Sequence, residues 1–593
     1  MPMKNLLLIL CFNTLITPVA FGEADQPSKT PEEVAAVVRE ASQWRADHRI
    51  IDLHQHIDFT PEHLARAVKM MDAVGVGVAV NLGTGVVTPG KEGGPSEFER
   101  NKALSDKLHP GRLIHYMLLD YKGFDEEGFA ERAAAQIETG HRLGAAGLKE
   151  FKRLGLFLRD SKGKLIRIDD ARFDLMWEKC GELGMPVSIH VADPKAFWEP
   201  FNDRNERWKE LKDHRSWWFG DAAKYPPRME LLEALDRVIA RHPKTTFVCV
   251  HFANNSEELD WVDAALDRRP NMMADLAARI PELGRHETAT LQKLFIKHQD
   301  RIVFATDFMV YNRLILGSSG SEPPPTDEDG ITFFTKEWRW LETLDRDWAH
   351  MTPIQGDWTI SSIGLPTNVL RKIYFDNARK LLARSLPPPV IKASHVDQDF
   401  EPTADLSAPQ WQHTPTTHLE YMLVDGKPRP ELSTEVRCVW TKESLHIAYR
   451  CPYKKLTVFE GPPPKTKRLG LWDRDVVEAF IGTSLTEIQR YDEFELAPTN
   501  ERLDVRLNLP AKDFDWSSGF TSATHVDETS GVWTAEMRIP FSALTTTLPS
   551  AGTRWRLNLY RSDANGHAFL AWNPTLSRTA HQPERFGVLE FSE

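Results

Sequence analysis

The sequence predicts an α/β fold, a (β/α)8 TIM barrel, followed by an all-β sandwich domain. Three observations support this prediction. Eight short apolar runs alternate with longer helical stretches between residues 49 and 382, a proline cluster then interrupts the chain, and short alternating segments fill the remainder. The chain has 593 residues, which is too many for one hydrophobic core, so several domains are expected.

The first segment has the pattern of a secretory signal peptide. Lys4 supplies a positive charge, residues 6–19 are mostly apolar, and Ala20 and Gly22 place small side chains before Glu23. The apolar run is shorter than the roughly 20 residues that a membrane span needs. We therefore expect residues 1–22 to be removed and the protein to be secreted or periplasmic, without a membrane anchor. Residues 23–47 are expected to form an N-terminal helical segment, with an amphipathic helix at 33–44.

Residues 48–386 are predicted to form the barrel. Each apolar run is short enough for a buried strand, and each is followed by a stretch long enough for a helix that crosses back to the next parallel strand. Helical stretches include residues 127–143, 174–183, 229–241 and 257–267, and a last helix is expected at 368–382. The predicted strands are 49–54, 74–81, 112–119, 145–151, 185–190, 245–251, 271–276 and 301–307.

The pattern changes after the barrel. Residues 387–390 begin with three consecutive prolines and are expected to form a stiff linker. From residue 391 to 593 the helical period disappears, and turn residues separate short alternating segments, which is typical of a β-sandwich. The predicted strands there are 435–440, 445–451, 476–481, 492–496, 502–507, 532–539, 554–561 and 586–591.

Composition and cysteine placement narrow the class of protein. The formal net charge is −12, and no basic cluster favours nucleic-acid binding. Cys180 falls in a predicted helix and Cys249 in a predicted strand, so both are expected in the core. A turn at 441–444 would place Cys438 opposite Ile447 and away from Cys451, so these cysteines are also expected to be free.

Five candidate metal-binding side chains lie where predicted barrel strands end. His54 and His56 are two residues apart on the first strand, so both point to the same side. His190, His251 and Asp307 end the fifth, sixth and eighth strands. Carboxyl ends of barrel strands meet at one face, which is where active sites of this fold lie. Imidazole and carboxylate groups are ligands for Zn²⁺ and similar divalent ions.

With these residues in this order, the barrel resembles the amidohydrolase superfamily, in particular its amidohydrolase-2 branch. The resemblance extends over about residues 48–384 and includes GLKEFK at 147–152, AARIPELGR at 277–285 and KIYFDNA at 372–378. It implies a metal-dependent enzyme that holds one or two divalent ions, with zinc expected. His54, His56 and His190 would be ligands. Asp307 would bind the metal, orient the attacking water and transfer its proton. His251 would be a second-metal ligand or would polarise the substrate.

Lys149 at the end of the fourth strand has two interpretations. Strand alternation places it on the same side as Phe151 and opposite Glu150 and Lys152, which favours an inward position. In binuclear relatives of this superfamily a lysine at this place is carboxylated and bridges two metals. The alternative is an ammonium group that binds an anionic part of the substrate.

Candidate substrate-binding residues surround the mouth of the predicted barrel. Residues 191–228 form a long connection rich in tryptophan and arginine, including Arg207 and Trp208, and long loops at this face are often functional lids. A packed subdomain is the alternative for this segment. Arg279, just past the seventh strand, is the preferred single candidate for binding an anion.

The C-terminal domain resembles the carbohydrate-binding domain of family nine. The residues that carry the resemblance are LWDRDVVEAF at 471–480, YDEFEL at 491–496, WRLNLYR at 555–561 and PERFG at 583–587. The resemblance implies that Trp472 and Trp572 sandwich a sugar ring and that Glu478 binds hydroxyl groups. The alternative is that these aromatic side chains are part of the core, as is usual in sandwiches.

The preferred interpretation is a secreted metal-dependent hydrolase that cleaves a C–N, C–O or lactone bond in a small, carbohydrate-derived or carboxylated substrate. A metal-dependent non-oxidative decarboxylase of the same family is the first alternative. A non-catalytic polysaccharide-binding protein, in which the barrel is a scaffold, is the second. Barrels of this kind often pair, which makes a homodimer the prior expectation.

Overall fold

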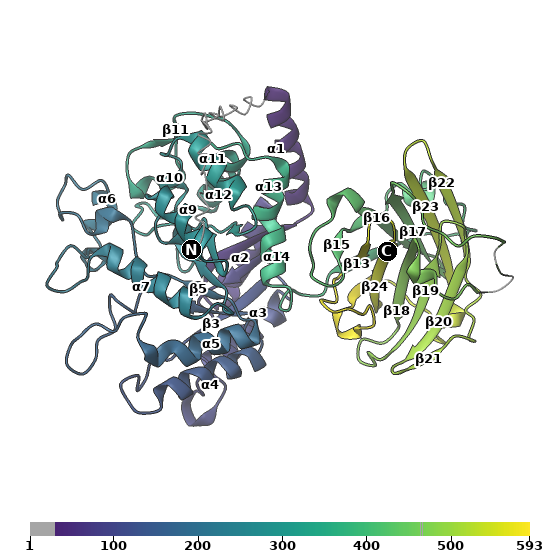
Figure 1. Ribbon diagram of the computed structural model, residues 1–593, viewed down its shortest axis with the longest axis horizontal. Coiled ribbons are helices and arrows are strands. Elements are labelled where there is room, and N and C mark those ends of the chain that lie inside the picture. Colours follow the sequence, from purple (N-terminus) through teal and green to yellow (C-terminus); the bar gives the residue numbers. More distant parts are fainter. Residues whose placement is uncertain (1–29, 463, 465–466) are drawn as a thin grey trace, which may run out of the picture.

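The computed structural model describes residues 30–462, 464 and 467–593 of the chain. The expected signal peptide at residues 1–22 lies outside these residues. A helix-rich body, on the left of Figure 1, is joined to a β-rich body on the right. The first body is a parallel barrel surrounded by helices and the second is a β-sandwich, as the sequence predicts.

The barrel strands follow one another in the sheet in the order in which they occur in the sequence, and each neighbouring pair is parallel. The ring closes where the Leu53 N–H donates to the Phe304 carbonyl at 3.0 Å and the Asp307 N–H donates to the His54 carbonyl at 2.9 Å. Two short strands, β9 (Phe308–Val310) and β10 (Leu314–Leu316), extend the sheet beside the first strand. Each predicted run overlaps one of the eight strands: β1 (Ile50–Ile57), β2 (Val76–Asn81), β3 (Leu113–Leu118), β4 (Gly147–Glu150), β5 (Val187–Ile189), β6 (Phe247–Cys249), β7 (Met272–Asp275) and β8 (Ile302–Val303).

Amphipathic helices cover the outside of the barrel. In α4 the buried residues Phe129, Ala133, Ile137 and Gly140 recur every three or four positions, which forms one apolar stripe facing the strands. All the helices that cover the barrel show this division between a buried and an exposed face. They are α2 (Pro61–Val74), α3 (Glu97–Leu108), α4 (Phe129–Arg142), α5 (Asp174–Leu183), α7 (Arg228–Arg241), α9 (Leu259–Arg268), α11 (Thr288–Lys297) and α12 (Asp327–Glu342).

Helices from both ends of the barrel segment pack together. Helix α1 (Pro31–Ala46) begins at Thr30, whose side chain accepts from the Glu33 N–H in a capping box. The predicted final helix consists of α13 (Thr367–Arg371), a π-helical stretch (Lys372–Asp376) and α14 (Asn377–Leu381). Gly77 on β2 lets the turn after α1 approach, because a Cβ there would lie 1.8 Å from the His48 carbonyl oxygen.

The sandwich core lies between two antiparallel layers. Strands β16, β17, β22 and β23 form one layer, and β18, β19, β20 and β24 form most of the other. Strand β13 pairs in parallel with β26 at its start and with β16 at its end, so it connects the layers. The sequence-based prediction missed β13. The strands are β13 (Val390–His395), β16 (Thr434–Trp440), β17 (Ser444–Pro452), β18 (Val476–Gly482), β19 (Arg490–Leu496), β20 (Arg502–Asn508), β22 (Thr521–Asp527), β23 (Val532–Pro540), β24 (Arg554–Asp563) and β26 (Gly587–Phe591), with shorter strands β14 (Thr417–Leu419), β15 (Tyr421–Met422), β21 (Ala511–Asp513) and β25 (Ala568–Ala571).

The cysteine predictions are confirmed. Cys438 pairs with Ile447 in the β16–β17 hairpin, which is the expected register. Cys180, Cys249, Cys438 and Cys451 are all buried and free. The described part of the chain therefore has no disulfide, and its fold depends on packing and hydrogen bonds.

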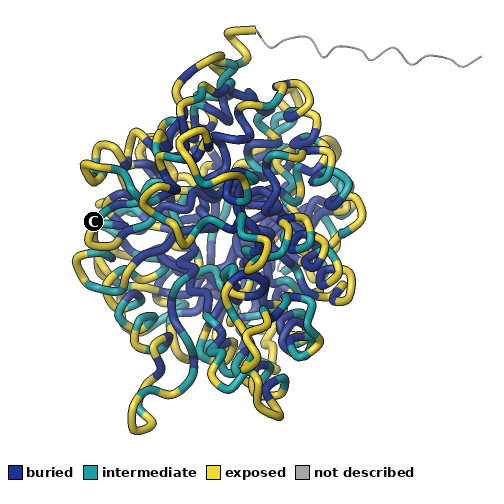
Figure 2. The backbone as a smooth tube through the Cα atoms, turned by 90° about the vertical axis from the view of Figure 1, so that its left-hand side faces the viewer, coloured by how far each residue is buried: buried dark blue, intermediate teal, exposed yellow. Residues whose placement is uncertain are grey.

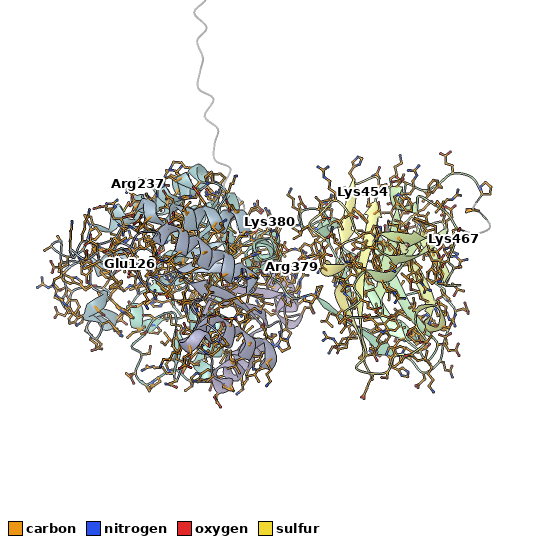
Figure 3. The ribbon with its side chains drawn as sticks, turned by 90° about the horizontal axis from the view of Figure 1, so that it is seen from below. Glu126, Arg237, Arg379, Lys380, Lys454 and Lys467 are labelled. Carbon is orange, nitrogen blue, oxygen red and sulfur yellow. The ribbon has the colours of Figure 1, made fainter. Side chains whose placement is uncertain are left out.

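An ion-pair cluster joins the sandwich to the base of the barrel. Glu420 accepts from Arg49, which immediately precedes β1, and from Arg371 at 2.8 Å. The Tyr421 hydroxyl donates to Asp376 at 3.1 Å. These barrel residues lie near the amino end of β1 and in the last helix, so the sandwich is docked opposite the carboxyl ends of the strands. Arg379 and Lys380 lie at this junction in Figure 3, whereas Lys467 lies at the far end of the sandwich.

The mouth of the barrel faces away from the sandwich. Helix α6 (Trp208–Leu211), part of the long connection after β5, lies at the left edge of Figure 1, with the sandwich on the right. Figure 2 looks from this side and shows a buried centre surrounded by exposed loops. Within the described part of the chain, no helix has both the length and the apolar character needed to cross a membrane.

Candidate active site

Three ligand-type atoms converge at the carboxyl ends of the barrel strands. His54 Nε2 lies 3.2 Å from His56 Nε2 and 3.3 Å from Asp307 Oδ1. His56 Nε2 lies 3.5 Å from the same carboxylate oxygen. Asp307 Oδ1 is buried without a hydrogen-bond partner, and an orphaned buried acceptor is costly. A divalent cation would satisfy all three atoms, so the residues fit a metal.

His251 and His190 complete the ring of histidines. One ligand atom from each of His54, His251 and Asp307 lies within 4.8 Å of the others. The His190 and His251 rings are 4.4 Å apart between centroids. His251 Nδ1 lies 2.8 Å from the Ala277 carbonyl and donates to it, which leaves Nε2 as the lone-pair nitrogen. The structure therefore brings all five ligand-type side chains together.

Carboxylates behind the histidines hold them in place. Asp275, the last residue of β7, places Oδ2 3.0 Å from His54 Nδ1. Asp193 places Oδ1 3.2 Å from His190 Nε2, and its other oxygen pairs with Lys152. Such acid–histidine contacts orient metal ligands in many proteins. Neither acid was predicted from the sequence. Asp275 ends an apolar strand, which is the pattern that identified His190, His251 and Asp307.

Several residues of this centre have left-handed backbone angles. Asp307 has φ +60°, His251 +56° and Ala278 +55°. This region disfavours residues other than glycine and costs roughly 1–3 kcal/mol each. At Asp307 the neighbouring hydrogen bonds hold the turn, because Asp52 accepts from the Thr306 N–H at 3.1 Å and from its hydroxyl at 2.6 Å. The strained backbone angles therefore occur at His251 and Asp307, whose side chains lie in the centre, and at the neighbouring Ala278.

Burial sets the protonation of the centre. It lowers the pKa of His54, His56 and His251 well below the usual value, and the positive charges of neighbours such as Lys149 and Arg279 lower it further. These imidazoles are therefore neutral, which is the form that binds a metal. Burial also raises the pKa of Asp307 to about 7, although Lys149 and Arg279 oppose the shift.

Lys149 on β4 lies within the same centre. Its Nζ is 5.2 Å from the centroid of the Phe151 ring, so the two side chains share one side as expected. Burial lowers the pKa of Lys149 to about 8, against the attraction of Asp275 and Asp307. Among the residues that the structure describes, Lys149 forms no ion pair. The arrangement leaves both the bridging and the ammonium interpretation open.

The expected substrate-binding residues differ in whether their charges are already paired within the protein. Arg279 is buried, donates to the Ala278 carbonyl at 2.9 Å and forms no ion pair within residues 30–462, 464 and 467–593. Arg207 differs from the expectation. It is only 1% exposed and pairs with Glu210 at 3.0 Å and with Glu282, so it has no free charge for a ligand.

The long connection after β5 is a packed subdomain around its aromatic residues. Trp208 is half-buried against Phe201, with ring centroids 5.0 Å apart. Arg215 lies between the rings of Phe201 and Trp218, at 4.0 and 4.2 Å. Of the three proposed substrate residues, Arg279 alone presents a charge without an ionic partner in the described structure.

The expected sugar-binding residues of the sandwich do not form two exposed platforms. Trp472 is 44% exposed in the short turn Leu471–Asp473 that precedes β18, which suits a stacking surface. Trp572 is only 5% exposed and packs in the core, where a Cβ on Gly587 would lie 2.5 Å from its ring. Glu478 is buried beside the paired Glu495 on β19. The structure therefore departs from the prediction at Trp572, whose ring faces are covered by protein.

Comparison with protein families agrees with these two bodies. Residues 51–384 match the family model described as "Amidohydrolase". The chain belongs to the amidohydrolase family. Residues 405–593 match the model described as "Carbohydrate family 9 binding domain-like". The family match begins in β1, ends just after α14 and includes all five ligand-type side chains.

Each of the known proteins that resemble this amidohydrolase matches only part of the chain. A protein named "Extracellular protein" from Arthroderma benhamiae is 26% identical over 185 residues, which are 28% of this chain and 81% of that protein. A 2,6-dihydroxybenzoate decarboxylase from Rhizobium is 14% identical, with 56% of this chain and 98% of that chain covered and a TM-score of 0.31. A family 9 carbohydrate-binding module from Caldicellulosiruptor kristjanssonii, solved with cellotriose, is also 14% identical, with 34% and 94% covered and a TM-score of 0.27.

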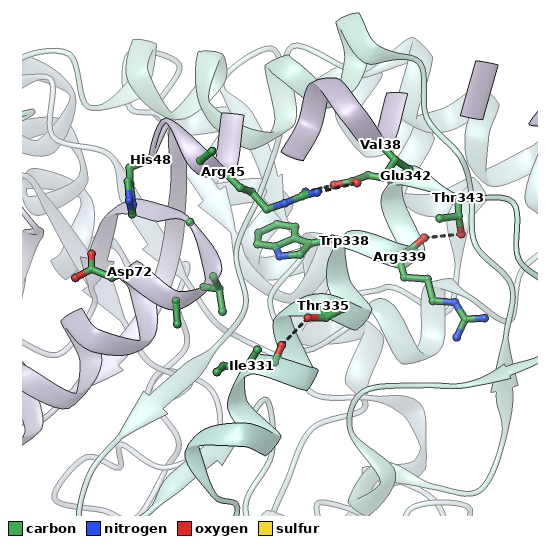
Figure 4. A pocket seen from close by; sticks show the side chains of 14 residues that line it. Val38, Arg45, His48, Asp72, Ile331, Thr335, Trp338, Arg339, Glu342 and Thr343 are labelled. Carbon is green, nitrogen blue, oxygen red and sulfur yellow. Dashed lines mark hydrogen bonds and ion pairs between the residues drawn. The ribbon is translucent and has the colours of Figure 1, made fainter. Parts of the chain in front are cut away.

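The amidohydrolase also has a cavity of about 510 Å³ outside the barrel, between α1, the end of α2 and α12 (Figure 4). Arg45 lies over the Trp338 ring at 5.3 Å and pairs with Glu342. Arg339 pairs with Asp345 at 2.7 Å. These charges already have partners, and the ligand-type histidines do not line the cavity. The convergent, incompletely satisfied groups are at the barrel mouth, so we place the candidate active site there.

Proposed function

We propose that this chain is a secreted hydrolase that uses a divalent metal, zinc being the expected ion, to cleave a C–N, C–O or lactone bond in a small substrate. The observation that carries the proposal is the convergence of His54 Nε2, His56 Nε2 and the unpartnered Asp307 Oδ1 within 3.5 Å of one another. Neutral imidazoles and a carboxylate suit Zn²⁺. His190 and His251 stand beside them.

The side chains would divide the chemistry among them. When bound, the metal supplies a Lewis acid and lowers the pKa of a coordinated water towards about 7. Asp307 lies beside the same atoms, 3.3 Å from His54 Nε2, so its carboxylate can accept a proton from the attacking water and return it to the leaving group. His251 lies beside these residues and could bind a second metal or polarise the substrate.

Arg279 favours an anionic substrate. Its guanidinium is buried near Asp307 and donates a hydrogen bond to the backbone carbonyl of Ala278. A substrate carboxylate would supply the missing counter-charge through a charge-assisted hydrogen bond. Small lactones, amides and esters that carry a carboxylate are therefore the first substrates to screen.

A non-oxidative decarboxylase is the second candidate. In this reaction the buried Arg279 would hold the substrate carboxylate that leaves as CO₂. In the hydrolase, the carboxylate that it holds would remain on the product. Product analysis separates the two reactions, because decarboxylation releases CO₂ and hydrolysis consumes water. Labelled carboxylate recovered as bicarbonate would favour the decarboxylase.

Metal content tests the proposal directly. We expect elemental analysis of the purified protein to give one or two divalent ions per chain, and the His54→Ala/His56→Ala variant to lose them. His141→Ala is the matched control, because His141 is exposed in the last turn of α4 on the outside of the barrel. Failure of the wild-type protein to take up metal, even on reconstitution, would overturn the proposal and favour a polysaccharide-binding protein with a non-catalytic barrel.

For the sandwich we propose glycan binding through Trp472 and export of the whole chain. The exposed indole offers one face for a sugar ring, and the relative named "Extracellular protein" supports a location outside the cytoplasm. We expect Trp472→Ala to abolish retention of the full chain on insoluble cellulose. Wild-type protein that no polysaccharide in a panel retains would contradict the assignment.

A further inference from the structure

Asp275 contacts two of the five ligand-type residues at once. It ends β7, is 1% exposed and places Oδ2 3.0 Å from His54 Nδ1. Its other oxygen accepts from the His251 N–H at 2.7 Å and from the Ala277 N–H at 3.2 Å. One side chain on β7 therefore contacts both His54 on β1 and His251 just after β6.

The contact with His54 determines which ring nitrogen carries the proton. An ionised carboxylate is an acceptor only, so His54 Nδ1 must donate to it. The Nε2 lone pair then faces His56 and Asp307, which is the direction in which a metal would lie. The two backbone N–H donors bind the other carboxylate oxygen, which turns Oδ2 towards His54 Nδ1.

The contact with His251 acts on the backbone. His251 has φ +56°, and the following residues Phe252 and Ala253 have φ +52° and +61°. Left-handed residues other than glycine persist where surrounding contacts impose them. The His251 N–H donates to Asp275 at the beginning of this strained turn. Asp275 therefore helps to fix the backbone position of His251 as well as the ring of His54.

We propose that Asp275 is a positioning residue that holds His54 as the Nδ1–H tautomer and thereby presents its Nε2 to the metal. The inference rests on the metal-dependent function proposed above. It differs from a purely structural role, in which Asp275 serves only as an acceptor for the two backbone N–H groups of the β6 and β7 loops.

Asparagine at this position separates the two roles. The Asp275→Asn side chain keeps an oxygen that can accept from the His251 and Ala277 N–H groups, but it places an NH₂ donor against His54 Nδ1. His54 would then move its proton to Nε2 and lose the lone pair that binds metal. We expect Zn²⁺ affinity, measured by competition with a chromophoric chelator, to fall by about 10–100-fold, with little change in the circular dichroism spectrum.

The control is Asp174→Asn, which alters a similar acid–histidine contact (Asp174 Oδ1 to His242 Nε2, 3.0 Å) between the outer helices α5 and α7. Its Zn²⁺ affinity should equal that of the wild type. An Asp275→Asn protein with wild-type Zn²⁺ affinity would overturn the inference and leave Asp275 a structural residue. If the wild-type protein binds no metal, the proposed function fails instead.

A second measurement applies if Asp275→Asn does not fold. Long-range ¹H–¹⁵N spectra of metal-free wild-type protein, labelled at histidine, report which ring nitrogen is protonated. The His54 signals are assigned by their loss in His54→Ala. We expect the Nδ1–H pattern for His54, and an Nε2–H pattern would refute the inference without reference to metal or activity.

Discussion

At the scale of single residues, the centre combines side chains that sequence can identify with backbone angles that it cannot. His251, Ala278 and Asp307 all have left-handed φ values, although none is glycine or asparagine. Histidine and aspartate adopt that region more often than most side chains, but still only rarely, so residue identity does not predict it. The angles follow from contacts made by residues remote in sequence, such as Asp52 and Asp275. The strand ends could therefore be predicted, but not the direction of the side chains.

Arg279→Ala tests the anion site at this scale. Removing a hydrogen bond to a charged group costs about 1.5–3 kcal/mol, so KM for a carboxylate substrate should rise roughly 10–150-fold at about 1.4 kcal/mol per tenfold. The kcat should change much less. Steady-state kinetics on a substrate found by the screen measure both constants.

Arg285→Ala is the matched control, because Arg285 is exposed and pairs with Glu206 at 3.1 Å. Its kinetics should match those of the wild type. An Arg279→Ala enzyme with an unchanged KM would show that the substrate does not use this cation.

The residues that sequence misjudged have environments that depend on distant partners. Arg207 was expected to bind substrate, but Glu282, which lies 75 positions later in the numbering, neutralises it. Trp572 was expected on the surface, but the backbone at Gly587 covers it. Charge pairing and packing of this kind bring together distant segments, and a local pattern contains no information on them.

At the scale of elements, the barrel strands were predictable because their apolar runs are bounded and their order is regular. The sandwich was predicted less completely. Strand β22 (Thr521–Asp527) was missed because it is polar and lies at a sheet edge, where only β23 pairs with it. Strand β13 was missed because its pairing with β26 and β16 joins segments far apart in the chain. A polar edge strand such as β22 lacks the alternation of buried and exposed residues that identifies a strand.

The pairing of β18 with β19 has a consequence for stability. Glu495 is fully buried opposite Glu478. Burial, together with the neighbouring charges of Glu478 and Glu493, raises the pKa of Glu495 well above its usual value. Because the unfolded carboxyl ionises near pH 4.3 and the folded one does not, the free energy of unfolding should fall as the pH rises above that value.

Glu495→Gln should remove this pH-dependent cost. We expect the variant to be more stable than the wild type at pH 8, and the difference to shrink towards pH 4. Thermal unfolding at both pH values measures it. Glu487→Gln, at an exposed residue paired with Arg490, should show no such difference. A Glu495→Gln variant that is less stable at pH 8 would indicate that the carboxylate has a stabilising partner.

At the scale of the whole molecule, the sandwich and the barrel mouth lie at opposite ends. Arg49 contacts the sandwich, and His54 lies five residues further along β1, roughly 17 Å away at about 3.3 Å per residue. The sandwich therefore lies on the side of the barrel opposite the mouth, so a ligand bound to the sandwich would not reach the ligand-type side chains of the same chain.

This arrangement was not predictable, because the docking contacts join residues 49, 371 and 420. Burial alone would raise the pKa of Glu420, but Arg49 and Arg371 outweigh it and lower the pKa to about 2. Since the unfolded value is near 4.3, the pairing contributes its full stabilisation above that pH. The contribution should be lost progressively as the pH falls through about 2.

Glu420→Gln tests whether this cluster fixes the two bodies relative to each other. Removing one partner of a buried ion pair costs about 3–5 kcal/mol, because the remaining charges are left uncompensated. Arg371 keeps its pair with Asp376 at 2.9 Å, whereas the variant removes the ion pair between Arg49 and Glu420. At pH 7 we expect the variant to have a larger radius of gyration in X-ray scattering and faster proteolysis at residues 383–389. Glu431→Gln, an exposed residue that pairs with Arg429 within the sandwich, should behave as the wild type. If Glu420→Gln has the wild-type radius and cleavage rate, apolar packing at the junction, and not the ion pairs, holds the sandwich against the barrel.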